Sequence, residues 1–277
     1  MSLSAIRAEA RPLVITGARI VDPKSGLDAI GSVVVVDGLI RDVARGAAPG
    51  VPEGATIIEA RGKALLPGLI DMRVFVGEPG AEHRETFASA GQAAAAGGVT
   101  TIVTMPDTDP VIDDVALVDF IARLARDTAP VNVPMAALTK GLKGREMTEF
   151  GLLGAAGAVG FSDGRHSITN ALVLRRALTY ARDFGALIMH HPADPDLVGS
   201  GVMNEGETAT RLGLPGIPRE AEIIMLERDI RIAALTGGRY HAAQISCAAS
   251  LDIIRRAKKQ GLAVSCGVSA THLALNE

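Results

Sequence analysis

The segment LLPGLIDMRVFVGEPG, residues 65–80, decides how the rest of the chain is interpreted. It holds the apolar run Gly68–Val76 between two Pro-Gly turns, which is typical of a strand buried on both faces. Positions two apart on a strand share a face, so Arg73, Phe75 and Gly77 all face the same side of the sheet. If such strands close into a barrel, these three positions line its interior.

Similar apolar runs recur after this segment and alternate with helical segments. The runs cover Gly68–Val76, Val99–Met105, Val131–Leu138, Ala158–Phe161, Ala186–His190, His241–Ser246 and Ala263–Val268. The helical segments cover Glu85–Ala96, Val115–Ala125, Ala171–Phe184, Arg219–Thr236 and Ala249–Gln260. Buried strands that alternate with helices form parallel βαβ units. The sequence therefore predicts an α/β fold, a TIM (β/α)8-type barrel in which seven strands are visible.

The eighth strand of such a barrel is missing, because the sequence stops at Leu275–Glu277, just after the seventh run. Three explanations stay open. The chain is a fragment of a longer product, it is a naturally shortened protein that closes its edge by dimerisation, or it is an open α/β sheet with a miscounted strand. We favour the fragment, because an uncovered parallel edge promotes association.

Residues 12–61 have a different sequence pattern, with short β-rich runs and no helical segments between them. Three short β-rich runs, PLVITGARIVD, SVVVVDGLIRDVA and TIIEA, are separated by Gly, Pro and Asp turns, as in a meander or small sandwich. We therefore predict a small β-domain over residues 1–62, the N-terminal part of a composite sandwich, and a C-terminally incomplete barrel domain over residues 63–277.

Composition excludes several classes of function. A net charge of −3 gives no basic patch by bulk count, which argues against a nucleic-acid partner. No apolar run reaches the roughly 18 residues that a membrane helix needs, and the N-terminus lacks the pattern of a signal peptide. Cys247 and Cys266 are isolated, so neither a disulfide framework nor a thiolate zinc site is expected. We expect a cytoplasmic protein.

Several further segments carry a resemblance to a known family. They are Glu82–Thr86 (EHRET), Ala93–Thr101 (AAAAGGVTT), Met105–Thr108 (MPDT), Ala158–Gly164 (AVGFSDG), Gly201–Pro218 (GVMNEGETATRLGLPGIP), Tyr240–Ser246 (YHAAQIS) and Ser269–Leu273 (SATHL). Together with residues 65–80 they resemble the dihydroorotase family of cyclic amidohydrolases, of the multifunctional-complex type. The resemblance implies a zinc-containing barrel that cyclises carbamoyl aspartate in pyrimidine synthesis and often associates with aspartate carbamoyltransferase.

The first strand departs from the family at every functional place. There the family reads roughly PGLIDxHxHLRxPG, with two zinc histidines and an arginine that binds the substrate carboxylate. This chain has Arg73, Phe75 and Gly77 instead. Neither a guanidinium nor a phenyl ring offers a lone pair to a metal ion. Phe75 is expected to fill core space. Arg73 either pairs with a neighbouring acid or occupies the vacated metal position and pairs with Asp163.

The other transferred positions give a mixed result. His191 falls where the family has a metal histidine, and Asp163 lies in the element that supplies an aspartate ligand. Gln244 stands where another metal histidine is expected. Asp107 replaces the asparagine that meets the substrate carboxylate, which brings like charges together unless this acid is protonated or paired. His272 keeps a family histidine and joins Gly77 and Asp107 as a substrate-pocket candidate.

The histidines give the same result without the family. His83, His166, His190, His191, His241 and His272 form no HxH, HExxH or similar spacing. A zinc site needs three or four lone-pair donors, and the best set is Asp163, His191 and the poor ligand Gln244. We therefore predict no cofactor. Zinc enters only in the alternative interpretation, with Asp163 and His191 as its candidates.

The predicted function is that of a non-catalytic dihydroorotase homologue, a pseudoenzyme of pyrimidine biosynthesis. It has lost most metal ligands and serves as a structural partner or activator of aspartate carbamoyltransferase, itself forming a homo-oligomer. The simultaneous loss of donors at Arg73, Phe75 and Gln244 and of the arginine at Gly77 supports this interpretation. The alternative is an active cyclic amidohydrolase that hydrolyses dihydroorotate to N-carbamoyl-aspartate at an atypical metal site.

Overall fold

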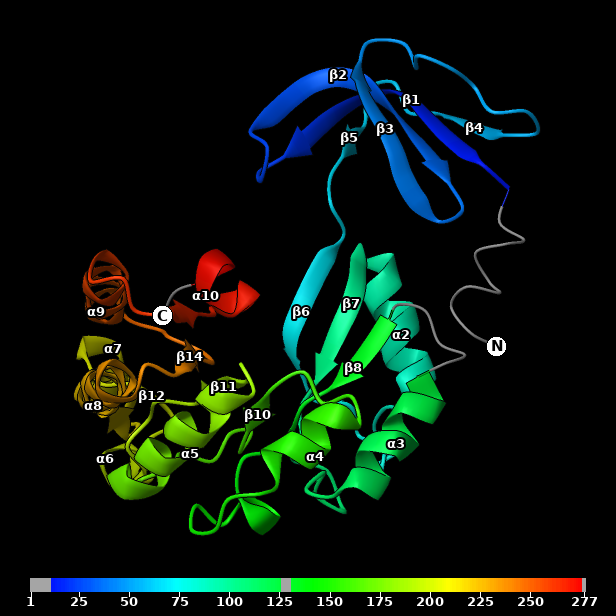
Figure 1. Ribbon diagram of the computed structural model, residues 1–277. Helices are drawn as coiled ribbons and strands as arrows, with labels where there is room; N and C mark the ends of the chain where they lie inside the picture. Colours follow the sequence, from blue (N-terminus) through cyan, green and yellow to red (C-terminus); the bar gives the residue numbers. More distant parts are fainter. Residues whose placement is uncertain (1–10, 126–130, 276–277) are drawn as a thin grey trace. The chain divides into compact units, whose positions relative to one another are not determined.

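The structure is a computed structural model that describes residues 11–125 and 131–275 (Figure 1). The chain divides after Gly68 into two compact units, each described here by itself. The predicted outer domain limits, residues 1 and 277, lie outside the described residues.

The first unit is a single five-stranded sheet. Its strands are β1 (Leu13–Asp22), β2 (Leu27–Val36), β3 (Leu39–Arg45), β4 (Thr56–Glu59) and β5 (Ala64–Leu65), in the order β3-β2-β1-β4, with β5 also on β1. The pairs β1–β2 and β2–β3 are antiparallel, whereas β4 and β5 run parallel to β1. The β2–β3 hairpin turns at Asp37-Gly38, both at positive φ, as a two-residue hairpin requires. Because β5 pairs with β1, the first unit continues past residue 62 to Gly68.

The second unit contains the repeated strands, and all of their pairings are parallel. They are β6 (Leu69–Val74), β7 (Val99–Thr104), β8 (Val131–Pro134), β9 (Ala136–Ala137), β10 (Phe161–Ser162), β11 (Leu187–His190), β14 (Arg239–Ala242) and β15 (Val264–Cys266). The predicted strand Val131–Leu138 is one strand broken at Met135: β8 pairs with β7 and β9 with β10. The strand predicted over 241–246 instead ends at Ala242, and the residues after it form the barrel mouth.

The strands follow one another in sequence order, from β6 through β8 and β9 to β15, with no reversal. That order is the one of a (β/α) barrel, since a doubly wound sheet reverses direction at its switch point. Within the described residues β6 pairs only with β7, and β15 only with β14. A groove of about 610 Å³ lies between these two edges, lined by residues such as Ile70 and Arg73 on one side and Gln244 and Gly267 on the other.

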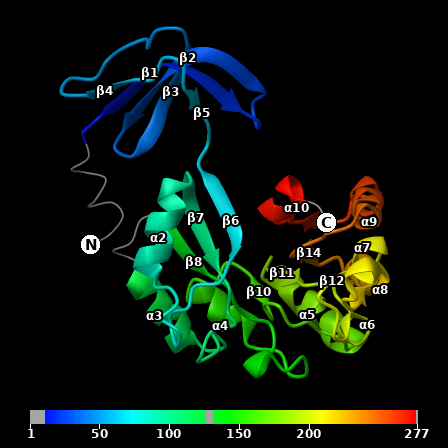
Figure 2. The same ribbon diagram turned by 180° about the vertical axis from the view of Figure 1, so that it is seen from behind.

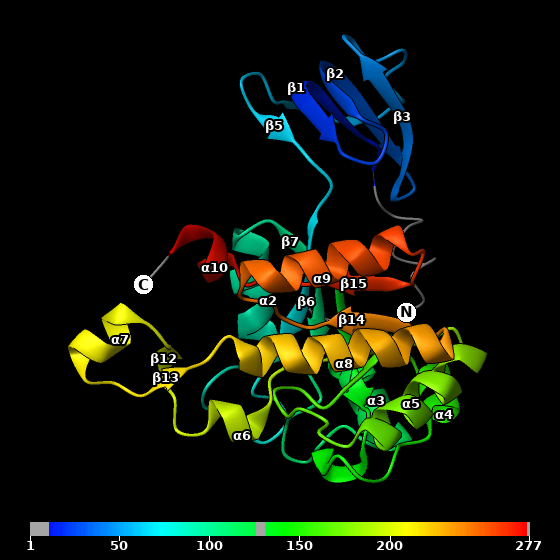
Figure 3. The same cartoon turned by 90° about the vertical axis from the view of Figure 1, so that its left-hand side faces the viewer.

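The predicted helices all form. They are α2 (Phe87–Ala96), α3 (Val115–Leu124), α5 (Ala171–Asp183), α8 (Glu220–Thr236) and α9 (Ala248–Lys259). Thr86, Asp114 and Asn170 cap the first three by accepting backbone N–H bonds. Figure 2 shows α2 and α3 beside the β6–β8 sheet, and Figure 3 shows α8 and α9 side by side. No helix in the described part of the chain is long and apolar enough to cross a membrane.

Shorter elements lie in the loops, where the apolar pattern gave no signal. They are the 3-10 turn η2 (Lys140–Leu142), α4 (Phe150–Ala155), α6 (Pro195–Val198), β12 (Met203–Asn204), α7 (Glu207–Leu212), β13 (Gly216–Ile217) and α10 (Ala270–Ala274). Most of these follow strands and so stand at the end of the barrel where ligand sites form.

The barrel core has two layers. The larger cluster lies between strands and helices and includes Phe161, Ile188 and Tyr240. The smaller cluster fills the interior with Val103, Met105, Met135, Met189 and Ala243. Ile188 and Met189 are neighbours on β11 but belong to different layers, as strand alternation requires.

Candidate functional site

Arg73 spans the open side of the barrel. It lies on β6, and its Nη1 donates to Oε1 of Gln244, which follows β14. This orientation agrees with the prediction that Arg73 faces the barrel interior. Val74 and Val76 pack against the outer layer, and Arg73 lies on the opposite face of the strand. Burial lowers the pKa of Arg73, the nearby Asp107 opposes that effect, and the charge of Arg165 adds to it.

Of the two alternatives for Arg73, the structure contradicts the pairing with Asp163. Asp163 is 2% exposed and accepts two bonds from Thr139, one from the backbone N–H at 2.8 Å and one from the hydroxyl. The reason is strand parity: Asp163 is two residues after Phe161, which packs in the outer layer, so its carboxylate turns away from the interior. Burial raises the pKa of Asp163, and the bonds from Thr139 work against that shift.

Asp107 has found a partner, which removes the predicted conflict of like charges. Its side chain is 8% exposed, and Oδ2 accepts from Nε of Arg165 at 3.2 Å. Its second oxygen, Oδ1, is buried without a partner. The guanidinium of Arg165 lies over the ring of Phe75, 5.7 Å from its centre. Phe75 is therefore half-buried and supports an arginine, in contrast to the core-filling role that the sequence predicted.

Gly77, at the position where the resemblance implies a substrate-binding arginine, lies in a tightly packed loop. A Cβ at this position would lie 2.4 Å from the carbonyl oxygen of Ala81 and 3.1 Å from that of Glu85. The backbone N–H of Ala81 also donates to the carbonyl of Gly77. A side chain at position 77 therefore requires the loop to move.

His191 is the candidate metal-ligand position that keeps a nitrogen lone pair, and it lines a neighbouring pocket. Its Nδ1 is buried and has no hydrogen-bond partner. Burial, with smaller contributions from the charges of Arg73 and His190, lowers the pKa of His191 to about 4. The imidazole is thus neutral at neutral pH and offers a single lone pair.

His272 is not brought to these residues. It lies on the short α10, is exposed, and shows no side-chain bond to them within the described residues. Two arginines that the sequence reasoning missed are brought there instead. Arg84 and Arg165 line a cavity of about 280 Å³ together with Arg73, Phe75, Met105 and Asp107. Arg84 lies inside the quoted motif EHRET and Arg165 directly follows AVGFSDG, so the positive charge of both residues was the signal available in the sequence.

These residues do not fit the zinc ion that the resemblance implies. Three places hold Arg73, Phe75 and Gln244, and both oxygens of Asp163 are bonded to Thr139. Across residues 11–125 and 131–275 no group of three or more His, Cys, Asp or Glu side chains is placed to hold a metal ion. A tetrahedral site cannot be built from His191 alone.

The sequence did not predict a second polar cluster, around His190, in which both ring nitrogens of the histidine have hydrogen-bond partners. His190 Nδ1 lies 2.6 Å from Oδ2 of Asp229, and Nε2 accepts the backbone N–H of Ile168 at 2.7 Å. The hydroxyl of Tyr240 donates to the same Asp229 oxygen at 2.7 Å, and Arg228 donates to the other. His190, Asp229 and Tyr240 are at most 1% exposed. The sequence signal was an acid on the apolar face of a helix, between Leu226 and Ile230.

The class of protein follows from the fold: a parallel (β/α) barrel of the kind that carries its site at the carboxyl ends of the strands. Comparisons with known proteins agree with this class. A family model described as "Dihydro-orotase-like" matches residues 62–250. The chain therefore belongs to the dihydroorotase-like family.

Curated relatives point to the same family. A dihydroorotase of Anaeromyxobacter sp. (strain K) is 42% identical over 266 residues, which are 96% of this chain and 61% of the relative. A dihydroorotase of Geobacter sp. (strain M21) is also 42% identical, over 96% of this chain and 62% of its own length. The chain thus spans about three fifths of the length of these relatives.

Solved structures support the fold. The L-hydantoinase (dihydropyrimidinase) from Arthrobacter aurescens matches with a TM-score of 0.79 and 20% identity, over 95% of this chain and 59% of the other. The D-hydantoinase (dihydropyrimidinase) from Thermus sp. matches with a TM-score of 0.71 and 21% identity, over 95% and 59% of the two chains.

Proposed function

We propose that this chain is a non-catalytic dihydroorotase homologue of cytoplasmic pyrimidine biosynthesis. In this role it keeps the barrel as a structural partner or activator of aspartate carbamoyltransferase and acts as a homo-oligomer. The observation that carries the proposal is the bond between Arg73 and Gln244, two former metal positions that now bind each other. A positive charge held there repels a divalent cation.

The alternative is an active hydrolase with an atypical metal at His191, whose Nδ1 is free to accept a metal. The two proposals differ in metal content and turnover. We expect the purified protein to carry far less than one zinc per chain by elemental analysis and to show no hydrolysis of dihydroorotate above the blank. Stoichiometric zinc together with measurable hydrolysis would establish the alternative and defeat the first proposal.

A restored variant provides the positive control. Arg73→His, Phe75→His and Gln244→His together place imidazoles at three of the positions where the family resemblance implies metal histidines, and His191 holds a fourth. We expect this triple variant to take up zinc, with an apparent Kd of about 1 μM or tighter, because four donors complete a tetrahedral set. Arg175→His, on the exposed face of α5, is a control that adds a histidine elsewhere and should take up none.

The partner role has its own test. Aspartate carbamoyltransferase from the same source is mixed with this chain, and the complex is measured by size-exclusion chromatography with light scattering. We expect co-elution and a change in carbamoyltransferase rate that appears equally with the metal-free protein. Separate elution with an unchanged rate contradicts the partner proposal and leaves the metal result unaffected.

A further inference from the structure

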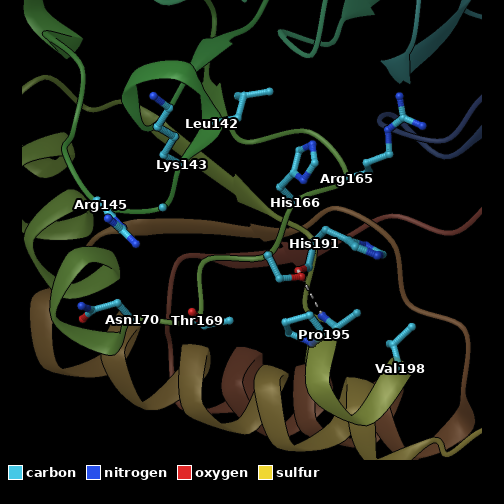
Figure 4. Close-up of a pocket in the computed structure, with 13 residues that line it drawn as sticks. Leu142, Lys143, Arg145, Arg165, His166, Thr169, Asn170, His191, Pro195 and Val198 are labelled. Carbon is cyan, nitrogen blue, oxygen red and sulfur yellow. Dashed lines mark hydrogen bonds between the residues drawn. The ribbon is translucent and has the colours of Figure 1, made fainter. Parts of the chain in front are cut away.

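A second pocket lies beside the barrel mouth and is built by three consecutive loops. It has a volume of about 620 Å³ and is lined from Leu142 to Arg145 after β9, from Arg165 to Asn170 after β10, and by His191, Ala193, Pro195 and Val198 after β11 (Figure 4). All three loops follow the carboxyl ends of parallel strands, where barrels bind their ligands. The volume is within the range of small-molecule sites.

The ionisable side chains that line this pocket are basic. Lys143, Arg145 and His166 line it, and none of the described residues that line it carries a carboxylate. Within the described part of the chain, none of these three side chains makes a hydrogen bond or an ion pair. Arg165 also lines the pocket (Figure 4), but its guanidinium already donates to Asp107. Three cationic or donor groups thus face one hollow without a counter-charge.

Two further features suit a ligand. The buried Nδ1 of His191, which lines the same pocket, has no partner. One wall is apolar, formed by Leu142, Pro195 and Val198. A ligand that fits therefore combines a strongly anionic end with an organic body.

We propose that this pocket binds a small phosphomonoester, such as a nucleoside monophosphate. A phosphomonoester carries about −1.5 to −2 charges at neutral pH and three acceptor oxygens, which match the donors on Lys143, Arg145 and His166. A single carboxylate offers one charge and two oxygens, and a dicarboxylate such as succinate divides its two charges between separate groups, so each satisfies this set less well. Arg165 lines both this pocket and the smaller cavity at Asp107. A ligand bound in the pocket would therefore contact the arginine that pairs with Asp107.

The test is isothermal titration calorimetry at low ionic strength with adenosine monophosphate, inorganic phosphate and succinate. We expect adenosine monophosphate to bind with a Kd of about 1 mM or tighter, and succinate at least about tenfold more weakly. Inorganic phosphate should bind more weakly than the nucleotide, because it leaves the apolar wall uncovered. Lys143→Ala with Arg145→Ala should weaken nucleotide binding at least about tenfold.

Matched controls keep the test decisive. Lys258→Ala with Lys259→Ala removes two exposed charges from the end of α9 and should leave nucleotide binding unchanged. Both double variants should melt as the parent does, since the Lys143 and Arg145 side chains are exposed and make no bond to other described residues. Absence of nucleotide binding up to about 10 mM, equal or tighter binding of succinate, or unchanged binding by the Lys143/Arg145 variant would overturn the proposal.

Discussion

His190 and His191 are neighbours in the chain, and they belong to two regions of opposite character. His190 faces the outer layer, where Asp229, Tyr240 and the Ile168 N–H satisfy both of its nitrogens. His191 faces the barrel mouth, where its Nδ1 is unsatisfied. The first region is a fully hydrogen-bonded structural network, and the second contains a buried polar atom without a partner. Two adjacent residues of one strand end can therefore differ completely in how their polar atoms are satisfied.

The largest expected effect on stability comes from a substitution in the His190 network. Asp229→Ala removes the acceptor shared by His190, Tyr240 and Arg228, and leaves their polar groups buried and unpaired. We expect a loss of about 3–5 kcal/mol in the free energy of unfolding, measured by urea denaturation. Asp183→Ala removes an exposed acid near Arg182 and should cost about 0.5 kcal/mol or less. Equal losses in the two variants would show that the network does not set this region apart.

The next largest effect is a pH dependence of the unfolding free energy that arises from His191 at the barrel mouth. His191 has a folded pKa of about 4 against an ordinary 6.5, so the unfolded chain takes up the proton first as the pH falls. Stability should therefore decrease from about pH 6.5 to about pH 4, by at most about 3 kcal/mol, and should not decrease further from this cause at lower pH.

The measurement for His191 compares urea unfolding of the parent and of His191→Gln at several pH values. The difference in unfolding free energy between the two should shift in favour of the variant as the pH falls through that window. A difference independent of pH would mean that solvent reaches the imidazole and that the mouth is not closed around it.

A smaller effect is expected at Asp163, which the sequence assigned to the mouth and the structure places outside it. Thr139→Val removes the hydroxyl that donates to Asp163 and accepts from the backbone N–H of Gly144. We expect a loss of about 1–3 kcal/mol, since two buried groups lose a partner. Thr179→Val, at an exposed site on α5, is the control and should cost only a few tenths of a kcal/mol. A Thr139→Val loss no larger than that of the control would contradict the assignment.

The smallest effect is expected at the mouth itself. Gln244→Ala removes the acceptor from Arg73, but the guanidinium lies in an open groove where water can replace it. We expect a loss of about 0.5–1 kcal/mol by the same urea measurement. A loss above about 2 kcal/mol would place the mouth in the same class as the His190 network and remove the contrast between the two regions.

Periodicity predicted most of the repeated elements because burial on both faces of a strand and on one face of a helix leaves a strong pattern. α5 begins at Ala171 as predicted, directly after its cap Asn170. The short α4 and α7 were not predicted, because each has only six residues and buries too few of them to set up a helical period: Phe150 and Leu153 in α4, and Ala209 in α7. The strand expected over 241–246 ended early, because apolar residues also line the mouth beyond the last ladder bond.

The sequence singled out some of the residues that the structure brings together at the mouth, such as Arg73, Phe75, Asp107 and Gln244, but missed Arg84 and Arg165 and most of the contacts. The sequence established that Arg73 and Phe75 offer no lone pair to a metal ion and that Gln244 is a poor ligand, because that depends on side-chain chemistry alone. Which groups pair was decided by the tertiary structure. Arg73 and Gln244 are 171 positions apart in the chain and meet only through the curvature of the barrel. Asp163 turned outward because a two-residue strand fixed its parity, and a sequence pattern does not reveal where so short a strand begins.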